Sequence, residues 1–262
     1  MKYKLQKDYS RFGLVLSKCI QKASLYSWWG YSKVLEYYWG MGRRRVDRDS
    51  EFLRNGFKLG TLNFDELTSL MDLLESAPDQ KMNAQDCHPE YLNNPYLEAI
   101  QSKFDDHFCY YDISGHRDLL RKIFSNYSST VRDCLGHPAR IVNIRCWKTL
   151  SGATEEGPNA WHVDHLAYGV HKMLVYLSPP GEETGTTEIR LKDGSVKSVK
   201  GPGGTWIFFN PTDSIHRGVP PRIESNERII LELMTVPAFK ENFEPVFAGL
   251  NATYPWFPWT EI

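Results

Sequence analysis

The sequence predicts a mainly β fold, an antiparallel double sheet or barrel with helices packed on one sheet, and two observations support this. After Pro138 the chain holds several short apolar runs, separated by Gly and Pro clusters and without a helical pattern between them. Before Pro138 the apolar residues recur at helical spacing, as stripes that need a surface to cover. This order favours an antiparallel sandwich or barrel over a βαβ fold.

Length and composition predict one globular domain over residues 1–262. Hydrophobic residues make up 41% of the chain, enough for a core, and aromatic residues make up 13%, which favours a packed interior or an apolar pocket over disorder. The 31 Lys and Arg residues nearly cancel the 32 Asp and Glu residues. Net charge therefore gives no reason to expect a nucleic-acid partner, and we predict none.

Cysteine usage indicates the compartment. The five cysteines are odd in number and form no CxxC pair, which predicts a reducing environment without a zinc ribbon or disulfide framework. We therefore expect a cytoplasmic protein. No signal-peptide pattern opens the chain, and Lys18, Lys22 and Lys33 interrupt its early apolar stretches, so no transmembrane helix is expected.

The two ends of the chain allow two interpretations each. Residues 1–50 are predicted to be a helical extension rich in Trp and Tyr, with three arginines at 43–45. This extension either touches a membrane surface or packs on the domain, and the second is favoured because such stripes are usually core. Residues 237–262 form a tail, whose aromatic stretch 254–259 is broken by prolines. We interpret that stretch as a lid or packed strap, with a protein-binding tail as the alternative.

Residues 51–136 are predicted to form a helical support for the sheets. Asn63 and Glu66 are spaced as a capping box at the start of one helix. A further helix over 117–135 is stopped by Gly136 and the residues after it, His137-Pro138. The other expected elements here are a turn into a short strand at 52–59 and a helix that begins at Asn94-Pro95.

Residues 137–236 are predicted to form the core of the sheets. Within the first strand, Asn143, Arg145, Trp147 and Thr149 share one face. The expected strands are 141–149, 172–177, 204–209 and 228–236, with a β-hairpin over 188–199 turning at Asp193-Gly194.

Three side chains form a candidate metal site. On a strand, His162 and Asp164 leave the same face about 7 Å apart at Cα. An imidazole from His216 completes the set of two histidines and one carboxylate that binds Fe(II) and leaves three positions open. The HxD pattern alone is weak, but the later histidine and Arg228 at the start of an apolar strand make the combination specific. His165 is expected on the opposite face of the strand, where it either packs or hydrogen-bonds to a metal ligand without binding the metal itself.

These residues resemble the Fe(II)/2-oxoglutarate-dependent oxygenases, whose fold is a cupin-like double-stranded β-helix, or jelly roll. The likeness covers residues 51–236 and is strongest to the phytanoyl-CoA dioxygenase-like branch. The stretches that carry it are 52–76, Trp161-His-Val-Asp-His165 with Tyr176-Leu-Ser178, and His216-Arg-Gly218 followed by Arg228-Ile-Ile-Leu231.

The resemblance implies that His162, Asp164 and His216 bind the iron and that Arg228 holds the distal carboxylate of 2-oxoglutarate. The charges of Fe(II), Asp164, 2-oxoglutarate and Arg228 sum to zero, which a buried site favours. Tyr176 is a further candidate for the same carboxylate, on a strand position where some relatives place a hydroxyl.

Two arginines leave alternatives open. Arg222 could compete for the carboxylate, and Arg228 is preferred because it begins a strand and so has a fixed direction. Arg145 binds the co-substrate or the substrate if its face lines the barrel, and pairs with a surface acid if that face points outward.

The activity implied by the resemblance is hydroxylation of a small-molecule or lipid-like substrate by dioxygen, with release of succinate and CO2. Because Asp164 is present, the resemblance does not imply halogenation. The alternatives are a cupin-like metal protein that does not use 2-oxoglutarate, such as an isomerase or another dioxygenase, and a non-catalytic jelly-roll binding protein. The primary substrate and the oligomeric state are not predicted.

Overall fold

A computed structural model describes residues 51–77, 79–81, 107–153, 159–164 and 169–246, with a few more between 26 and 37. Several predictions fall outside the described residues. They concern the helix that begins at Asn94, the position of His165, the aromatic stretch 254–259 and most of the N-terminal extension.

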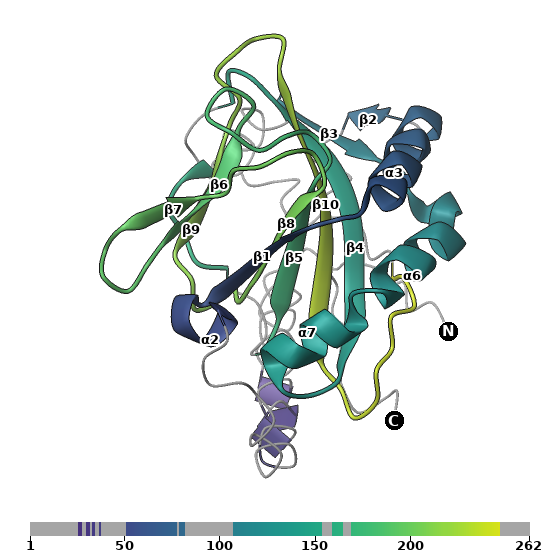
Figure 1. The fold of residues 1–262 in the computed structure, drawn as a ribbon, viewed down its shortest axis with the longest axis vertical. Coiled ribbons are helices and arrows are strands. Elements are labelled where there is room, and N and C mark those ends of the chain that lie inside the picture. Colours follow the sequence, from purple (N-terminus) through teal and green to yellow (C-terminus); the bar gives the residue numbers. More distant parts are fainter. Residues whose placement is uncertain are drawn as a thin grey trace, which may run out of the picture.

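The described strands form two antiparallel sheets (Figure 1). The larger sheet has the order β1 (Phe57–Thr61), β8 (Thr205–Phe209), β5 (His171–Tyr176), β10 (Glu227–Pro237), β4 (Ala139–Leu150), β3 (Phe108–Tyr111) and β2 (Asp79–Lys81). The smaller sheet has the order β7 (Val196–Ser198), β6 (Thr186–Arg190) and β9 (His216–Val219). The predicted double-stranded β-helix is therefore confirmed, and the expected hairpin is the β6–β7 pair.

One core lies between the two sheets. Its buried side chains include Ile189 from β6, together with Tyr176 from β5 and Ile230 from β10. The side chains of β5 and β10 alternate between two clusters: the inner one holds Leu174, Tyr176 and Ile230, and the one beneath the helices holds Met173, Val175, Leu231 and Leu233. The inner face of the larger sheet is thus the wall of the barrel.

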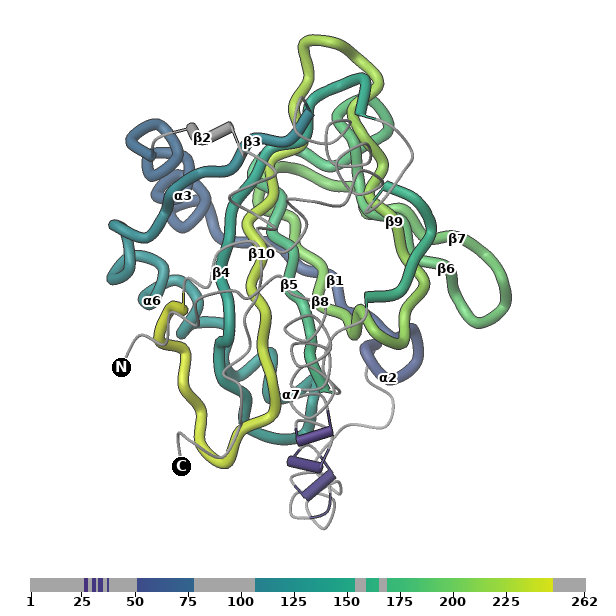
Figure 2. Tube along the Cα trace, turned by 180° about the vertical axis from the view of Figure 1, so that it is seen from behind, coloured from purple at the N-terminus to yellow at the C-terminus, as the bar shows by residue number. Residues whose placement is uncertain are grey.

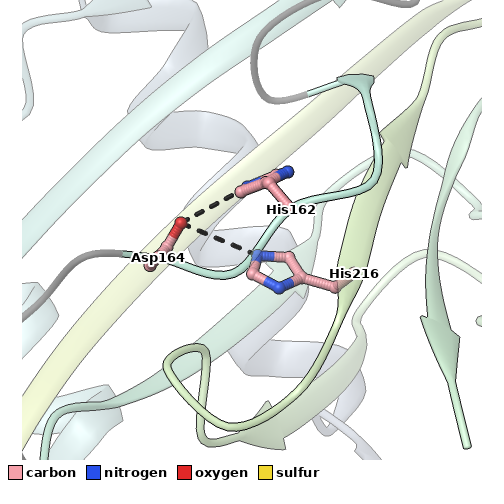
Figure 3. A group of neighbouring side chains, drawn as sticks. All are labelled: His162, Asp164 and His216. Atoms are coloured by element: carbon pink, nitrogen blue, oxygen red, sulfur yellow. Dashed lines mark ion pairs between the residues drawn. The ribbon is translucent and has the colours of Figure 1, made fainter.

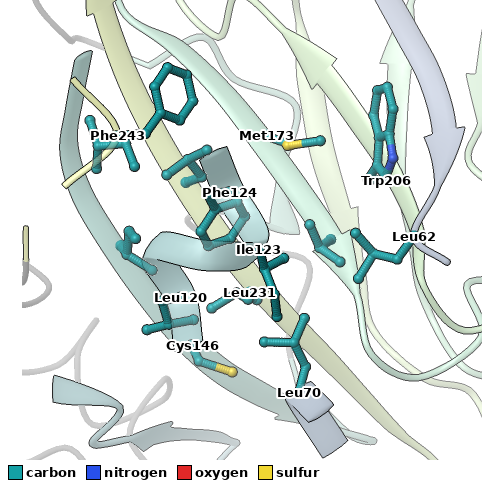
Figure 4. Close-up of a cluster of buried hydrophobic side chains, with 14 of the residues drawn as sticks. Leu62, Leu70, Leu120, Ile123, Phe124, Cys146, Met173, Trp206, Leu231 and Phe243 are labelled. Atoms are coloured by element: carbon teal, nitrogen blue, oxygen red, sulfur yellow. The ribbon is translucent and has the colours of Figure 1, made fainter. Parts of the chain in front are cut away.

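A second core lies between the larger sheet and the helices (Figure 4). It joins Phe124 and Leu70 of the helices to Met173 and Leu231 of the strands. The helices are α2 (Glu51–Asn55), α3 (Phe64–Ser76), the short 3-10 helix η3 (Ser114–His116), α6 (Arg117–Ser125) and α7 (Ser128–Leu135). The predicted packing of helices on one sheet is confirmed.

The single helix predicted over 117–135 is wrong, because the structure has two helices, α6 and α7, that break at Asn126 and Tyr127. The break has a tertiary cause in Glu66 of α3. Its carboxylate accepts hydrogen bonds from the Asn126 amide at 2.8 Å and from the Tyr127 hydroxyl at 2.6 Å. The same carboxylate completes the predicted capping box with Asn63. The predicted stop at Gly136 is confirmed, with φ of 73°.

Glu66→Ala is expected to lower the free energy of unfolding by about 1–3 kcal/mol, because it removes one half of the capping box and leaves the partly buried Tyr127 hydroxyl without its acceptor. Urea unfolding followed by tryptophan fluorescence measures the loss. Asp65→Ala, one residue earlier and exposed, is the control and should cost about 0.5 kcal/mol. Equal losses in the two variants would contradict the assigned role of Glu66.

After β10 the chain returns along the free edge of β4 (Figure 2). The amide of Ile141 donates to the Asn242 carbonyl at 2.9 Å, and that of Ile144 donates to the Val246 carbonyl at 2.7 Å. Of the N-terminal extension, Tyr31 is described as buried, with its ring edge-on to Phe239. Within the described ranges, no helix combines the length and hydrophobicity needed to cross a bilayer.

Candidate metal centre

The structure brings His162 and His216 side by side from positions 54 apart in the chain. Their backbones form one antiparallel bridge, with both N···O distances at 2.9 Å. The strand predicted around His162 is wrong, because this bridge is its only strand pairing in the described segment 159–164. Asp164 is held instead by a hydrogen bond from its amide to the Pro211 carbonyl at 2.9 Å.

The three predicted metal ligands converge on one point (Figure 3). The Oδ1 atom of Asp164 lies 3.3 Å from Nε2 of His162 and 3.9 Å from Nε2 of His216. The candidate ligand atoms of the three side chains all lie within 4.8 Å of one another. Two nitrogens and one carboxylate oxygen in this arrangement form a donor set suited to a divalent transition metal.

Backbone carbonyls fix the orientation of both imidazoles. Nδ1 of His162 lies 2.7 Å from the Ala160 carbonyl, and Nδ1 of His216 lies 2.8 Å from the Ser214 carbonyl. Because a carbonyl only accepts, Nδ1 carries a proton in both rings, and Nε2 is the nitrogen turned toward Asp164. Burial lowers the pKa of His216 to about 4, so this ring is neutral at physiological pH.

The Asp164 carboxylate is ionised. Burial disfavours its charge, but a hydrogen bond with His162 and the ammonium of Lys172 together hold the pKa of Asp164 below its usual range. Nζ of Lys172 lies 2.5 Å from Oδ2 of Asp164. The hydrogen bond to Asp164 also raises the pKa of His162.

A chain of buried charges runs from the metal site across the inner face of the larger sheet. Lys172 Nζ lies 3.1 Å from Oε2 of Glu232, and Oε1 of Glu232 lies 2.6 Å from Nε of Arg145. Charges of opposite sign therefore alternate along the four residues Asp164, Lys172, Glu232 and Arg145. Sequence reasoning missed Lys172 and Glu232. In β5, Lys172 lies on the same face of the strand as Tyr176, and in β10, Glu232 lies on the same face as Arg228, so the alternation along each strand could have found both.

The structure answers one question about Arg145. Its face lines the barrel, since in the β4–β10 register Arg145 lies opposite Glu232 and Thr149 lies opposite Arg228. The acid that Arg145 pairs with is the buried Glu232 rather than a surface residue. That Arg145 contacts a co-substrate or a substrate stays a prediction.

Arg228 is buried on the same inner face, with 3% of its surface exposed. Its guanidinium donates to the carbonyls of Thr186 and Val219 and to the hydroxyl of Thr149. Nε has no hydrogen-bond partner, and no carboxylate in the described part of the chain forms an ion pair with Arg228. Burial lowers the pKa of this arginine. Arg222, the competing candidate, is exposed and pairs with Glu182.

Tyr176 and Gly218 complete the surroundings of Arg228. The Tyr176 hydroxyl is buried close to Thr186 and Thr187 but makes no well-aligned hydrogen bond within the described structure, and burial raises its pKa. A Cβ on Gly218 would lie 2.7 Å from two guanidinium nitrogens of Arg228. Gly218 and His216 share the inner face of β9, about 7 Å apart. The guanidinium therefore lies one inward-facing position along β9 from a candidate metal ligand.

Comparisons with known proteins identify the fold. No protein-family model matches the sequence, and a search of curated proteins finds no match. Among solved structures, the non-heme alpha ketoglutarate dependent epimerase SnoN from nogalamycin biosynthesis matches with a TM-score of 0.52 at 12% identity. This match covers 76% of the present chain and 84% of the epimerase. The chain shares the fold of this epimerase.

A second structure of SnoN, in complex with Fe3+, alpha ketoglutarate and nogalamycin RO, matches with a TM-score of 0.51 at 13% identity. It covers the same shares of the two chains, 76% and 84%. At this level of identity the likeness establishes the architecture, and the chemistry has to be argued from the residues of this chain.

Proposed function

We propose that the protein is a non-heme Fe(II)- and 2-oxoglutarate-dependent oxygenase that acts on a small molecule. The observation that carries the proposal is the position of Arg228. A buried guanidinium that has no anionic partner among the described residues lies on the same inner face as a histidine, aspartate and histidine that converge on one point. SnoN, which has this fold, was solved with iron and alpha ketoglutarate bound.

The donor set fits Fe(II). Two imidazole nitrogens and one carboxylate oxygen are the ligands of non-heme iron oxygenases, and they would leave half of an octahedral metal's positions open. His162, Asp164 and His216 would hold the ion. Since both Nδ1 atoms donate to carbonyls, neither ring has to reorient to present Nε2.

The surroundings of Arg228 fit a carboxylate. Buried polar atoms without partners are uncommon in native structures, and here two of them, Nε of Arg228 and the hydroxyl of Tyr176, lie on the same inner face. An arginine binds a carboxylate with two parallel hydrogen bonds and keeps its charge when buried. Arg228 and Tyr176 would hold the distal carboxylate of 2-oxoglutarate, and the metal would take its oxo-acid end.

When bound, iron and 2-oxoglutarate supply the activation of dioxygen and the oxidation of a substrate C–H bond, with succinate and CO2 released. The protein residues bind and orient these groups. The apolar side chains of the inner core, such as Ile230 and Phe209, would keep water from the place where Arg228 binds the 2-oxoglutarate carboxylate. We propose hydroxylation as the outcome, on a small-molecule or lipid-like substrate.

Conversion of 2-oxoglutarate to succinate tests the proposal. The protein is incubated in air with Fe(II), 2-oxoglutarate and a panel of small molecules, and succinate is followed by proton NMR. We expect succinate from the wild-type protein and none above background from Asp164→Ala. Iron binding without succinate formation across the panel would instead favour a metal protein of another kind or a non-catalytic binding protein.

Gly218→Ala is expected to weaken 2-oxoglutarate binding by about 10-fold while iron binding is kept, because the new methyl group displaces the Arg228 guanidinium. Isothermal titration of the Co(II)-loaded protein measures the 2-oxoglutarate affinity, and anaerobic equilibrium dialysis measures the iron affinity of the metal-free protein. Gly115→Ala, where an added Cβ meets nothing within 4 Å, is the matched control. A normal 2-oxoglutarate affinity in Gly218→Ala would show that Arg228 does not bind it.

A further inference from the structure

The two carboxylate oxygens of Asp164 have different partners. Oδ1 faces the Nε2 atoms of the two histidines, at 3.3 and 3.9 Å. Oδ2 points the other way and contacts the ammonium of Lys172 at 2.5 Å. One oxygen is therefore available to a metal between the imidazoles, and the other is engaged by a cation.

Lys172 is held in place by its own partner. In the β5–β10 register Lys172 lies opposite Met234, so Glu232 is its diagonal neighbour on the inner face. The Glu232 carboxylate is 2% exposed and contacts Lys172 through Oε2 and Arg145 through Oε1. With one partner on each oxygen, Glu232 has little freedom to release the lysine.

We propose that Lys172 is a positioning residue that reserves Oδ2 of Asp164 and so keeps this carboxylate a one-oxygen ligand. A carboxylate can bind a metal through one or both oxygens. If Asp164 used both, it would take a coordination position that 2-oxoglutarate or dioxygen needs. This inference rests on the proposed function and adds a residue to it.

Metal affinity alone does not measure this role, because the Lys172 ammonium acts on the metal in two opposite ways. It repels a divalent cation, which weakens metal binding, and it orients the carboxylate, which strengthens it. The number of water molecules on the bound metal separates the two effects. Loss of the lysine frees Oδ2 to displace one water, whichever way the affinity changes.

Mn(II) is the probe for this count, as a divalent ion that takes the same donors. The full-length protein is loaded with Mn(II) anaerobically, without 2-oxoglutarate. Broadening of the Mn(II) electron paramagnetic resonance lines in 17O-enriched water then gives the number of bound waters. We expect three waters in the wild-type protein and one fewer in Lys172→Met.

Further variants complete the experiment. Lys172→Arg keeps a cation and should retain the wild-type count. Lys148→Met makes the same substitution in β4, at a lysine on the face that points away from Arg145, and should leave the number of bound waters unchanged. Should Lys172→Met fail to fold, the double variant Lys172→Met/Glu232→Gln removes one charge of each sign and is expected to show the same missing water.

The outcomes separate this inference from the proposed function. Equal water counts in the wild-type protein and in a folded Lys172 variant overturn the role of Lys172 and leave the metal site intact. A wild-type count of two shows that Asp164 already binds through both oxygens and overturns it as well. A wild-type protein that binds neither Mn(II) nor Fe(II) refutes the proposed function, and the role of Lys172 with it.

Discussion

Arg228→Ala is expected to raise the dissociation constant for 2-oxoglutarate by about 100-fold, equivalent to about 3 kcal/mol. The guanidinium is buried, and its partners within the described part of the chain are two carbonyls and one hydroxyl, so its charge is available to an incoming carboxylate. Isothermal titration of the Co(II)-loaded protein measures the change.

Arg222→Ala is the control for this prediction. Arg222 also follows His216, but it is exposed and pairs with Glu182 at the surface. Its removal should leave 2-oxoglutarate affinity unchanged. If Arg222→Ala instead gave the large loss and Arg228→Ala gave none, the two arginines would have to exchange roles.

His216→Ala is expected to weaken Fe(II) binding by more than about 100-fold. Loss of a residue that only hydrogen-bonds to a metal ligand already costs about 10–100-fold in metal affinity, and this variant removes a candidate ligand itself. The ring is buried and neutral, and the Ser214 carbonyl holds it with Nε2 toward Asp164. Anaerobic equilibrium dialysis of iron measures the loss.

His116→Ala controls for the general loss of a histidine. His116 ends η3, on the helical side of the larger sheet, and its nearest polar partner is the Ser76 hydroxyl. Iron binding should be unaffected. Undiminished iron binding in a folded His216→Ala would move the metal to other residues.

Much of the fold was predictable from the sequence because burial leaves a periodic pattern. The alternation over 141–149 predicted the strand β4 and left open which of its faces points inward, and the capping box predicted the start of α3. The break between α6 and α7 was not predictable. It depends on the Glu66 carboxylate, which lies about 60 residues away in sequence and is brought there only by folding.

The candidate site was predictable in part for a similar reason. Histidines and an aspartate at characteristic spacing predicted which side chains meet, although His162 reaches its partner through a single bridge and not through a regular strand. Lys172 and Glu232 were missed because a charged residue in a strand usually faces solvent. Only the strand register shows that these two point into the barrel and toward Asp164.

The two histidines, Asp164 and Arg228 are proposed to bind one ferrous ion and one 2-oxoglutarate together. Anaerobic titration of the wild-type protein with Fe(II) and 2-oxoglutarate, followed by visible absorption, is the decisive measurement. We expect a metal-to-ligand charge-transfer band that saturates at one equivalent of each and is lost in His216→Ala. A wild-type protein that binds both and develops no such band, or that binds neither, would overturn the proposed site.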